Sequence, residues 1–571
     1  MRQTQLTLGR LAIFLIFGVG VWIGGGRGAQ AAEPAKKNKA EPVAVLCGAS
    51  YDRWHQNVEL VGTLSGCPDL AQGLEAMLNI ATANQGLVGL DKTRPWAAIV
   101  APNGPAVMAY ACLPVDRLGA LLKVVRPLVR DIVPHDRSQE IIFRDGTTIH
   151  VAGRNGWVVV ALDAATVDRA TADPMSAVGD LAARYDLGLR IYVARIPRAI
   201  RPILFAAVAS QNNERSTGMG DSDDVQCMVR EALRLGLDQL DRLTVGLKFN
   251  HDIPRMAAEL TLVAKRGTLL AERWAQFHAN NAHPAGFALP EATVAASWAG
   301  PLPPKVTVAI NTWLDQIEQK IADQLDQNQG ALVETEQVQS TKATLTDVLH
   351  HLPVDLPRFE ATTSLVLKPS QLTWIAAMRV PEGHVFRKKI EAYLADVGHD
   401  DKTTIRTEQA TDRDGPLLLH VLSFPLHAPA DKTFAPLTGQ KLETVVGLGK
   451  EYFYVSMGRG ALASLQKALA TARSQPPVLK SPITCMVALR PLAATVAMQS
   501  DQGAMRIDAR RIAEVLEKDS AYKDAVHFTA EPVAQGVRYR VELDEGVLKV
   551  VSLILGTVGV DRKNLESMPK K

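Results

Sequence analysis

The chain has 571 residues, of which 47% are hydrophobic and 22% charged, with 63 Lys and Arg against 60 Asp and Glu. Without residues 1–31 it loses Arg2, Arg10 and Arg27 and no acid, which leaves 60 basic against 60 acidic residues. A neutral chain of ordinary globular composition lacks the basic patch that nucleic-acid binding requires, which excludes nucleic acid as a partner.

The N-terminus predicts export. A short apolar run, Leu11 to Gly26, follows Arg2 and Arg10, and Ala29-Gln30-Ala31 then supplies the small residues that a signal peptidase reads. Cleavage after Ala31 gives a periplasmic or secreted protein, and the alternative is an uncleaved anchor on the outer face of the membrane. No later segment reaches transmembrane length.

Cysteine usage is sparse. Five cysteines are too few for a disulfide scaffold. Cys112 and Cys485 lie within apolar, strand-like runs, where a cysteine behaves as a small core residue. Cys47 and Cys67 flank a 19-residue loop and form the one candidate disulfide.

An internal repeat is the most informative feature of the sequence. Four segments of the first half recur in the same order in the second half: Met108–Pro114 with Trp374–Pro381, Gly156–Ala161 with Glu451–Ser456, Ile191–Pro197 with Cys485–Pro491, and the hairpin around Leu243–Val263 with Val526–Leu543. Pro114 and Pro381 are 267 residues apart, Trp157 and Tyr452 are 295 apart, and Pro197 and Pro491 are 294 apart. One insertion explains the change in spacing, so the pattern predicts a duplication.

The repeat predicts an α+β fold made of two tandem copies of an antiparallel or mixed sheet, with helices packed on one face. Hairpins such as the one around Pro102-Asn-Gly-Pro105 favour antiparallel neighbours. The predicted organisation is a signal peptide (1–31), a linker (32–44), a first repeat (45–300), a helical connector (301–355), a second repeat (356–560) and a tail (561–571).

Several segments resemble a family of large secreted proteins from planctomycete bacteria. The likeness lies in Leu240–Leu247, the strand Ala257–Leu262, Gly267–Leu270, Gly286–Val294, Trp157–Val160 and Asp186–Arg190. It covers most of residues 85–560, and its motifs are structural. The family brings no known activity, so the resemblance implies no functional residue.

The catalytic motifs in the sequence are weak. Ser464 and Lys467 match the Ser-x-x-Lys of penicillin-recognising enzymes, but they fall opposite the helix face that Leu465 and Leu469 define. Gly447 and Gly449 precede a strand, whereas the glycines of a dinucleotide site follow one. Glu259 and Glu542 occupy equivalent strand positions, as glycosidase carboxylates could, but alternation on a half-exposed sheet gives the same pattern.

The metal-ligating patterns are equally weak. Asp221, Asp223 and Asp224 lack the glycine and distal glutamate of a calcium loop. His278 and His283 lack a third ligand for zinc, and His350 and His351 are explained by a helix C-terminus. The sequence therefore predicts no catalytic residue, no metal site and no cofactor.

These features favour a non-catalytic envelope protein that binds a protein or polymer partner. One alternative is a periplasmic carrier of a lipid or other apolar ligand, which a sheet covered by helices could enclose. The other is an enzyme whose site matches no known motif.

Overall fold

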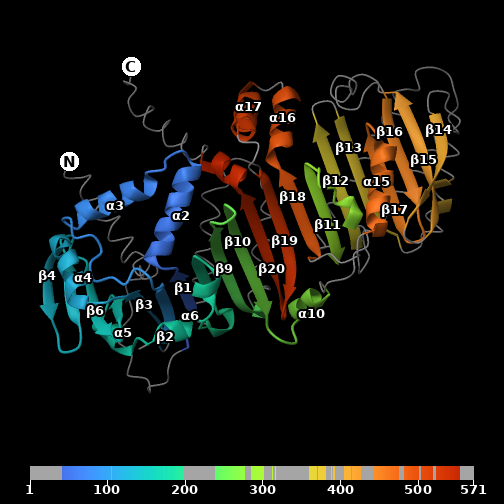
Figure 1. Ribbon diagram of the computed structural model, residues 1–571. Helices are drawn as coiled ribbons and strands as arrows, with labels where there is room; N and C mark the ends of the chain where they lie inside the picture. Colours follow the sequence, from blue (N-terminus) through green and yellow to red (C-terminus); the bar gives the residue numbers. More distant parts are fainter. Residues whose placement is uncertain are drawn as a thin grey trace, which may run out of the picture. The chain divides into compact units, whose positions relative to one another are not determined.

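The computed structural model describes residues 41–103, 106–171, 173–197, 238–276, 285–300, 312, 316, 359–368, 371–380, 387–388, 390–391, 404–412, 415–425, 441–474, 481–499, 503–518 and 523–552. Strand outweighs helix, and the strands form antiparallel sheet with helices packed on it (Figure 1). The predicted α+β class is therefore confirmed. The chain divides into two compact units, with the main boundary between Ala271 and Glu272.

The first unit contains ten strands among its described residues. They are β1 (Ala44–Gly48), β2 (Trp96–Asn103), β3 (Ala106–Pro114), β4 (Val129–Pro134), β5 (Gln139–Phe143), β6 (Thr148–Arg154), β7 (Trp157–Ala161), β8 (Leu187–Ile191), β9 (Leu240–Asn250) and β10 (Arg255–Ala264). Its helices are α2 (Tyr51–Leu64), α3 (Leu70–Ala81), α4 (Leu118–Val125), η1 (Arg126–Leu128), α5 (Ala164–Arg169), α6 (Met175–Val178), α7 (Leu181–Arg184) and η2 (Val193–Arg195).

Hydrogen-bonded neighbours in the first unit run in the order β4-β5-β6-β7-β3-β2-β1-β8-β9-β10, and each pair is antiparallel. The two ends of this order are built from hairpins, whereas β1, the first strand of the chain, lies in the middle between β2 and β8. Segments from residues 44 to 250 therefore meet around β1.

Helices cover both faces of the first unit's sheet. One core cluster takes Ala97 and Ile99 from β2 and packs against α5, α6 and α7. The other takes Ala98, which points to the opposite face, and packs against Leu121 and Val125 of α4. All five residues of β7 are consequently buried. The prediction that helices pack on one face is wrong here, because β7 and its neighbours are apolar on both sides.

The second unit also contains ten strands among its described residues. They are β11 (Val294–Gly300), β12 (Phe359–Lys368), β13 (Gln371–Arg379), β14 (Thr404–Thr411), β15 (Pro416–Pro425), β16 (Lys441–Leu448), β17 (Tyr452–Gly458), β18 (Ile483–Ala488), β19 (Ala525–Val533) and β20 (Gly536–Asp544). Its helices are η3 (Ala285–Phe287), α15 (Ala461–Ser474), α16 (Leu489–Gln499) and α17 (Gly503–Lys518), while α10 (Leu269–Ala275) spans the boundary.

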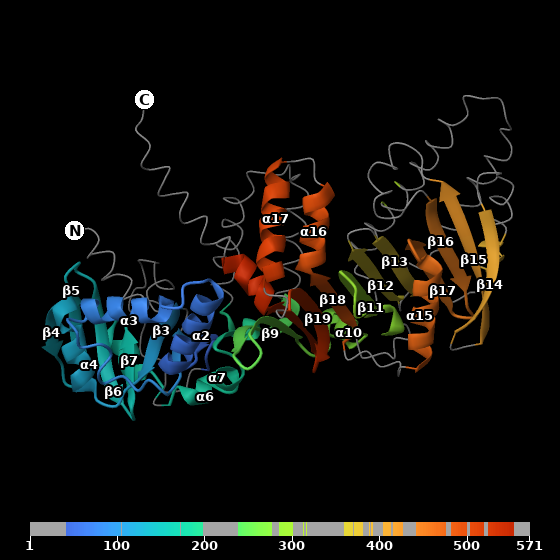
Figure 2. The same ribbon diagram turned by 45° about the horizontal axis from the view of Figure 1, so that its top comes forward.

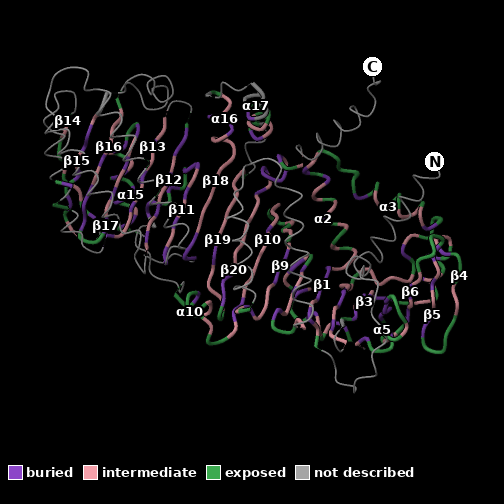
Figure 3. Tube along the Cα trace, turned by 180° about the vertical axis from the view of Figure 1, so that it is seen from behind, coloured by how far each residue is buried: buried purple, intermediate pink, exposed green. Residues whose placement is uncertain are grey.

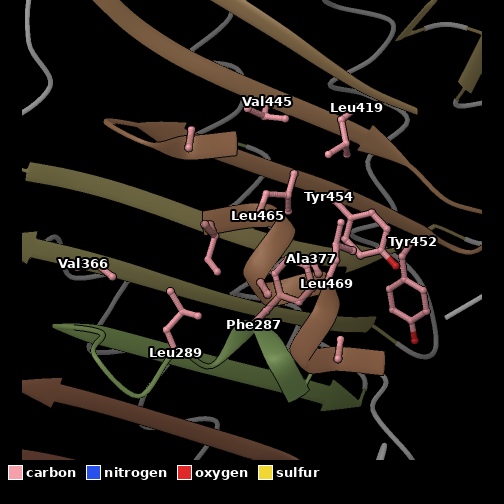
Figure 4. Packing of buried hydrophobic residues seen from close by; sticks show 14 of the residues in the cluster. Phe287, Leu289, Val366, Ala377, Leu419, Val445, Tyr452, Tyr454, Leu465 and Leu469 are labelled. Atoms are coloured by element: carbon pink, nitrogen blue, oxygen red, sulfur yellow. The ribbon is translucent and has the colours of Figure 1, made fainter. Parts of the chain in front are cut away.

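Neighbouring strands of the second unit run in the order β14-β15-β16-β17-β13-β12-β11-β18-β19-β20. Its main core lies between this sheet and α15, where Leu465, Leu469 and Phe287 pack on Tyr454 (Figure 4). Helices α16 and α17 lie side by side as a hairpin (Figure 2). Buried and half-buried residues alternate along β11, β12, β13 and β17 (Figure 3), as a sheet with one well-covered face requires.

The prediction of two separate tandem sheets is wrong, because the described strands belong to a single sheet. The first repeat was predicted to end at residue 300 and so to include β11. In the structure β11 belongs to the second unit, where it pairs with β12 and β18. Trp157 and Tyr452 begin β7 and β17 as the repeat predicted, and both are buried. Trp157 pairs with Pro114 and Tyr452 with Arg379, two residues before Pro381.

The predicted signal peptide (1–31), most of the linker (32–44), all but two residues of the 301–355 connector and the tail (561–571) lie outside the described residues. In the described part of the chain, none of the helices combines the length and the hydropathy that crossing a bilayer requires.

Candidate functional site

The richest polar site forms where β1 ends, β8 begins and β9 ends. Gly48 pairs with Leu187, which brings the chain leaving β1 next to the chain entering β8. Ser50 then caps α2, its Oγ accepting a hydrogen bond from the Arg53 amide at 3.2 Å. This cap begins the helix immediately after the strand, so the first turn of α2 faces the start of β8.

Asp186 joins three elements at this point. Its Oδ1 accepts from Arg53 Nε at 2.9 Å, and its Oδ2 accepts from the Phe249 amide at 2.6 Å. Arg53 Nη2 donates to the Phe249 carbonyl at 2.9 Å. One carboxylate and one guanidinium therefore tie α2 to β8 and β9, and both oxygens of Asp186 are occupied by these bonds.

Tyr185 forms the floor of the same region. It is buried, and its hydroxyl donates to Glu259 Oε2 at 2.7 Å while accepting from Arg184 Nη2 at 3.0 Å. Gly246 makes room for the ring, because a Cβ atom there would lie 2.2 Å from Tyr185 Cδ1. Any larger residue at this position would displace the tyrosine ring.

Asp180 sets the orientation of the neighbouring arginines. Its Oδ1 accepts from Arg190 Nη2 at 2.7 Å, and its Oδ2 lies 3.4 Å from Arg184 Nη1. Partial burial alone would raise the pKa of Asp180, but the hydrogen bonds and the charge of Arg190, with help from Arg184, lower it. Asp180 is therefore ionised across the neutral range and holds Arg184 beside Tyr185.

These residues border a pocket of about 350 Å³. We call it the cationic pocket and define it by Arg53, Arg184, Lys248 and Asp186, with Ser50, Thr93, Pro95, Tyr185 and three alanines completing its wall. Arg53 is paired with Asp186, and Arg184 with Asp180 and Glu259, whereas Lys248 has no ion-pair partner among the described residues. Guanidinium groups held in a fixed orientation suit the two oxygens of a carboxylate, and a lysine ammonium adds a point charge.

The corresponding positions of the second unit carry different chemistry. Leu187 and Ile483 begin β8 and β18, and their partners are Leu247 and Ala530. By this register Ser481 and Pro482 replace Tyr185 and Asp186, and Glu531 replaces Lys248. Ser481 Oγ donates to Glu531 Oε1 at 3.3 Å, and Glu531 pairs with Arg538 at 3.8 Å.

A second polar group of the second unit lies under its helices. Glu360 is fully buried, accepts from the Tyr452 hydroxyl at 3.0 Å and lies 3.8 Å from Arg379 Nη1. Burial, and then the charge of Glu360, raise the pKa of Tyr452 well above its ordinary value. A carboxylate with such partners is a packing feature of the core.

The predicted disulfide is not formed. Cys47 is a free cysteine buried in the core of the first unit, and Cys67 is a free, exposed cysteine. Helix α2 separates them with 14 residues, a rise of about 21 Å. A disulfide needs Cα atoms within about 7 Å. The 19 residues between the cysteines were interpreted as a loop, but most of them form α2, which holds the two cysteines apart.

Glu259 and Glu542, which were considered as a carboxylate pair, each have an arginine within their own unit. Glu259 lies 3.5 Å from Arg184, and Glu542 is bonded to Arg540. Both acids are thereby explained as partners of neighbouring strand and helix residues.

The remaining sequence candidates gain no support. Ser464 is half-buried and Lys467 is exposed, pairing with Glu291 at 2.6 Å, while Leu465 and Leu469 are buried as predicted. Gly447 lies within β16, and Gly449 follows that strand. The aspartates at 221, 223 and 224 and the histidines at 278, 283, 350 and 351 lie outside the described residues. Among the residues that are described, no group of three His, Cys, Asp or Glu could hold a metal.

Comparisons with models of protein families, with curated proteins and with solved structures find no match to this chain.

The sequence did not predict the cationic pocket. Asp186 lies in one of the segments that carry the family resemblance, and no motif includes Arg53, Arg184 or Lys248. Ser50 before an apolar helix pattern was an available N-cap signal, and it would have placed Arg53 in the first turn of α2.

Proposed function

We propose that the chain is an exported, non-catalytic binding protein, and that its cationic pocket takes an anionic group of a protein or polymer partner. One observation carries this proposal: in a pocket of about 350 Å³, Arg53 pairs with Asp186 and Arg184 pairs with acids outside the wall, whereas Lys248 has no ion-pair partner among the described residues. Positive charge therefore remains available to a ligand.

The bonding of the pocket's polar groups favours binding over catalysis. A general base needs an acceptor within reach of the substrate's proton, and both Asp186 oxygens already accept hydrogen bonds. The Tyr185 hydroxyl donates to Glu259. Groups held by such bonds are suited to fixing the orientation of a ligand.

We also infer that the chain arose by duplication. Each unit has ten described strands whose pairing follows the same order when the strands are counted from the start of the unit. In both, the unit's first strand pairs with its second and eighth. The resemblance to secreted planctomycete proteins supports the export of the chain.

An apolar-ligand carrier is the second candidate. Val294, Leu365, Trp374 and Met457 lie opposite one another on four neighbouring strands of the second unit, and all are half-buried. A row of this kind could contact an acyl chain. Native mass spectrometry tests it, since a bound lipid adds mass that delipidation removes.

Titration calorimetry at low salt tests the main proposal, with poly-L-glutamate and polygalacturonate as probes. The wild type should bind at least one of them, and Lys248→Glu should weaken binding about tenfold or more, about 1.4 kcal/mol. Arg137→Glu is the matched control, because Arg137 is an exposed cation of the β4–β5 turn outside the pocket. Failure of both probes, or equal loss in both variants, would refute the proposal.

Export has its own test. N-terminal sequencing of the protein from the cell envelope should begin near Ala32. An intact Met1 on membrane-bound protein would support the uncleaved anchor instead.

A further inference from the structure

A second pocket lies beside the cationic pocket in the first unit. It has a volume of about 330 Å³ and is formed by α2, α3 and the chain that returns from α3 to β2. We call it the amide pocket and define it by Asn79, Asn84 and Gln85. Ala83 and Asn84 have φ values of 52° and 62°, which turn the chain back over the end of α3.

The lining of the amide pocket suits a neutral, hydroxyl-rich group. Each amide offers both donors and acceptors. Glu75 adds an acidic acceptor group and Lys92 a basic donor group. Tyr51 contributes an aromatic ring with a polar tip, and the Lys92 ammonium lies 5.0 Å from its centre. The apolar part of the wall comes from Leu78, Leu87, Val88 and Leu90. A sugar ring presents the same mixture of hydroxyl groups and apolar C–H surface.

The same two chain segments, one at Ser50–Tyr51 and one at Lys92–Thr93, lie between the two pockets. Ser50 and Thr93 line the cationic pocket, while the next residue in one segment, Tyr51, and the preceding residue in the other, Lys92, line the amide pocket. The Asp52 amide donates to the Lys92 carbonyl at 3.1 Å, which joins the segments directly. Consecutive Cα atoms are about 3.8 Å apart, so the two pockets adjoin across these segments, at a separation on the scale of neighbouring sugar units.

We infer that the partner of this protein is an acidic polysaccharide, with an acidic sugar in the cationic pocket and a neutral sugar in the amide pocket. This inference rests on the proposed function. The charges favour an alternating polymer, because Glu75 and Lys92 offset each other in the amide pocket and leave it suited to a neutral sugar. For the same reason the amide pocket offers no net charge to a second carboxylate of a uniformly acidic peptide.

Calorimetry with glucuronate and with a hyaluronan disaccharide of glucuronate and N-acetylglucosamine tests the inference. We expect the disaccharide to bind the wild type about tenfold more tightly than glucuronate. Gln85→Ala should remove this gain and leave glucuronate binding unchanged, because Gln85 is exposed and lines only the amide pocket. Gln72→Ala, another exposed glutamine that lies outside the pocket on α3, should behave as the wild type.

The outcomes separate the two proposals. Equal affinity for glucuronate and the disaccharide would overturn the two-pocket inference, while loss of both in Lys248→Glu would still support the cationic pocket. Tighter binding of tetraglutamate that depends on Lys248 and not on Gln85 would replace the glycan by an acidic peptide. No binding of any of these anions, or binding indifferent to Lys248→Glu, would overturn the proposed function itself.

Discussion

In the first unit the chain enters β8 through Tyr185 and Asp186, whereas in the second it enters β18 through Ser481 and Pro482. The strands around these entries pair in the same order. The next strand along carries Lys248 in the first unit and Glu531 at the matching position in the second. The comparison shows that one architecture can carry a cationic pocket in one unit and an acid in the other, because chemistry changes at strand ends without disturbing the sheet.

The two units also differ inside. At matching register positions, Cys47 and Ala97 of the first unit correspond to Ser297 and Thr362 of the second, all of them buried. The face that carries these residues is therefore apolar at these positions in the first unit and polar in the second. Stability in the second unit therefore depends more on which buried hydroxyl groups have partners.

Removing the largest contact under α15 should have the strongest effect. Leu465 is fully buried against the second unit's sheet, so Leu465→Ala should cost about 2–5 kcal/mol of unfolding free energy through the cavity it leaves. Denaturant unfolding measures this loss. If the units are separate in stability, glucuronate binding by the first unit should persist in this variant, and its disappearance would show that the units unfold together.

Two buried serines of the second unit give a sharper test of the polar face. Ser364 and Ser456 both lie opposite Ile375 on adjacent strands. Ser364 Oγ donates to the Phe287 carbonyl at 2.7 Å and accepts from the Leu289 amide at 3.0 Å. Ser364→Ala should therefore cost about 1–3 kcal/mol, because it leaves buried backbone groups unpaired.

Ser456 is the matched control. Its buried hydroxyl has no hydrogen-bond partner among the described residues, so Ser456→Ala should leave the unfolding free energy unchanged or raise it. Equal destabilisation by the two substitutions would show that burial of a serine, and not its bonds, decides stability here.

The sequence predicted individual strands better than it predicted the contacts between them. The internal repeat predicted that Trp157 and Tyr452 are equivalent, and they begin β7 and β17. Alternation shows which residues share a face but not which strands are neighbours. The cationic pocket depends on that second fact, because Arg53 contacts Asp186 and Phe249 across 133 and 196 residues.

The smallest predicted effect concerns pH. Burial first, and then the charge of Arg53, lower the pKa of His251 below its ordinary 6.5, although Asp186, Asp252 and Glu59 oppose this. The unfolded chain then takes up the proton at higher pH than the folded chain. The stability from neutral His251 is complete above about pH 6.5 and is lost as the pH falls through the folded-state pKa.

Comparing the wild type with His251→Gln isolates this contribution. The other titratable groups are the same in both proteins, so the wild type should lose slightly more stability than His251→Gln as the pH falls below about 6.5. His251 Nε2 lies 2.8 Å from Asn57 Oδ1, and a glutamine amide can still donate to that oxygen. Parallel pH profiles would show that His251 does not titrate differently on folding.

The number of anion sites per chain tests the central claim most directly. If the cationic pocket belongs to the first unit alone, calorimetry with glucuronate should find one site per chain, and Lys248→Glu should abolish it. Two equivalent sites per chain would contradict the claim, because the second unit has Glu531 where Lys248 would be needed. A single site that keeps its affinity in Lys248→Glu would contradict it equally.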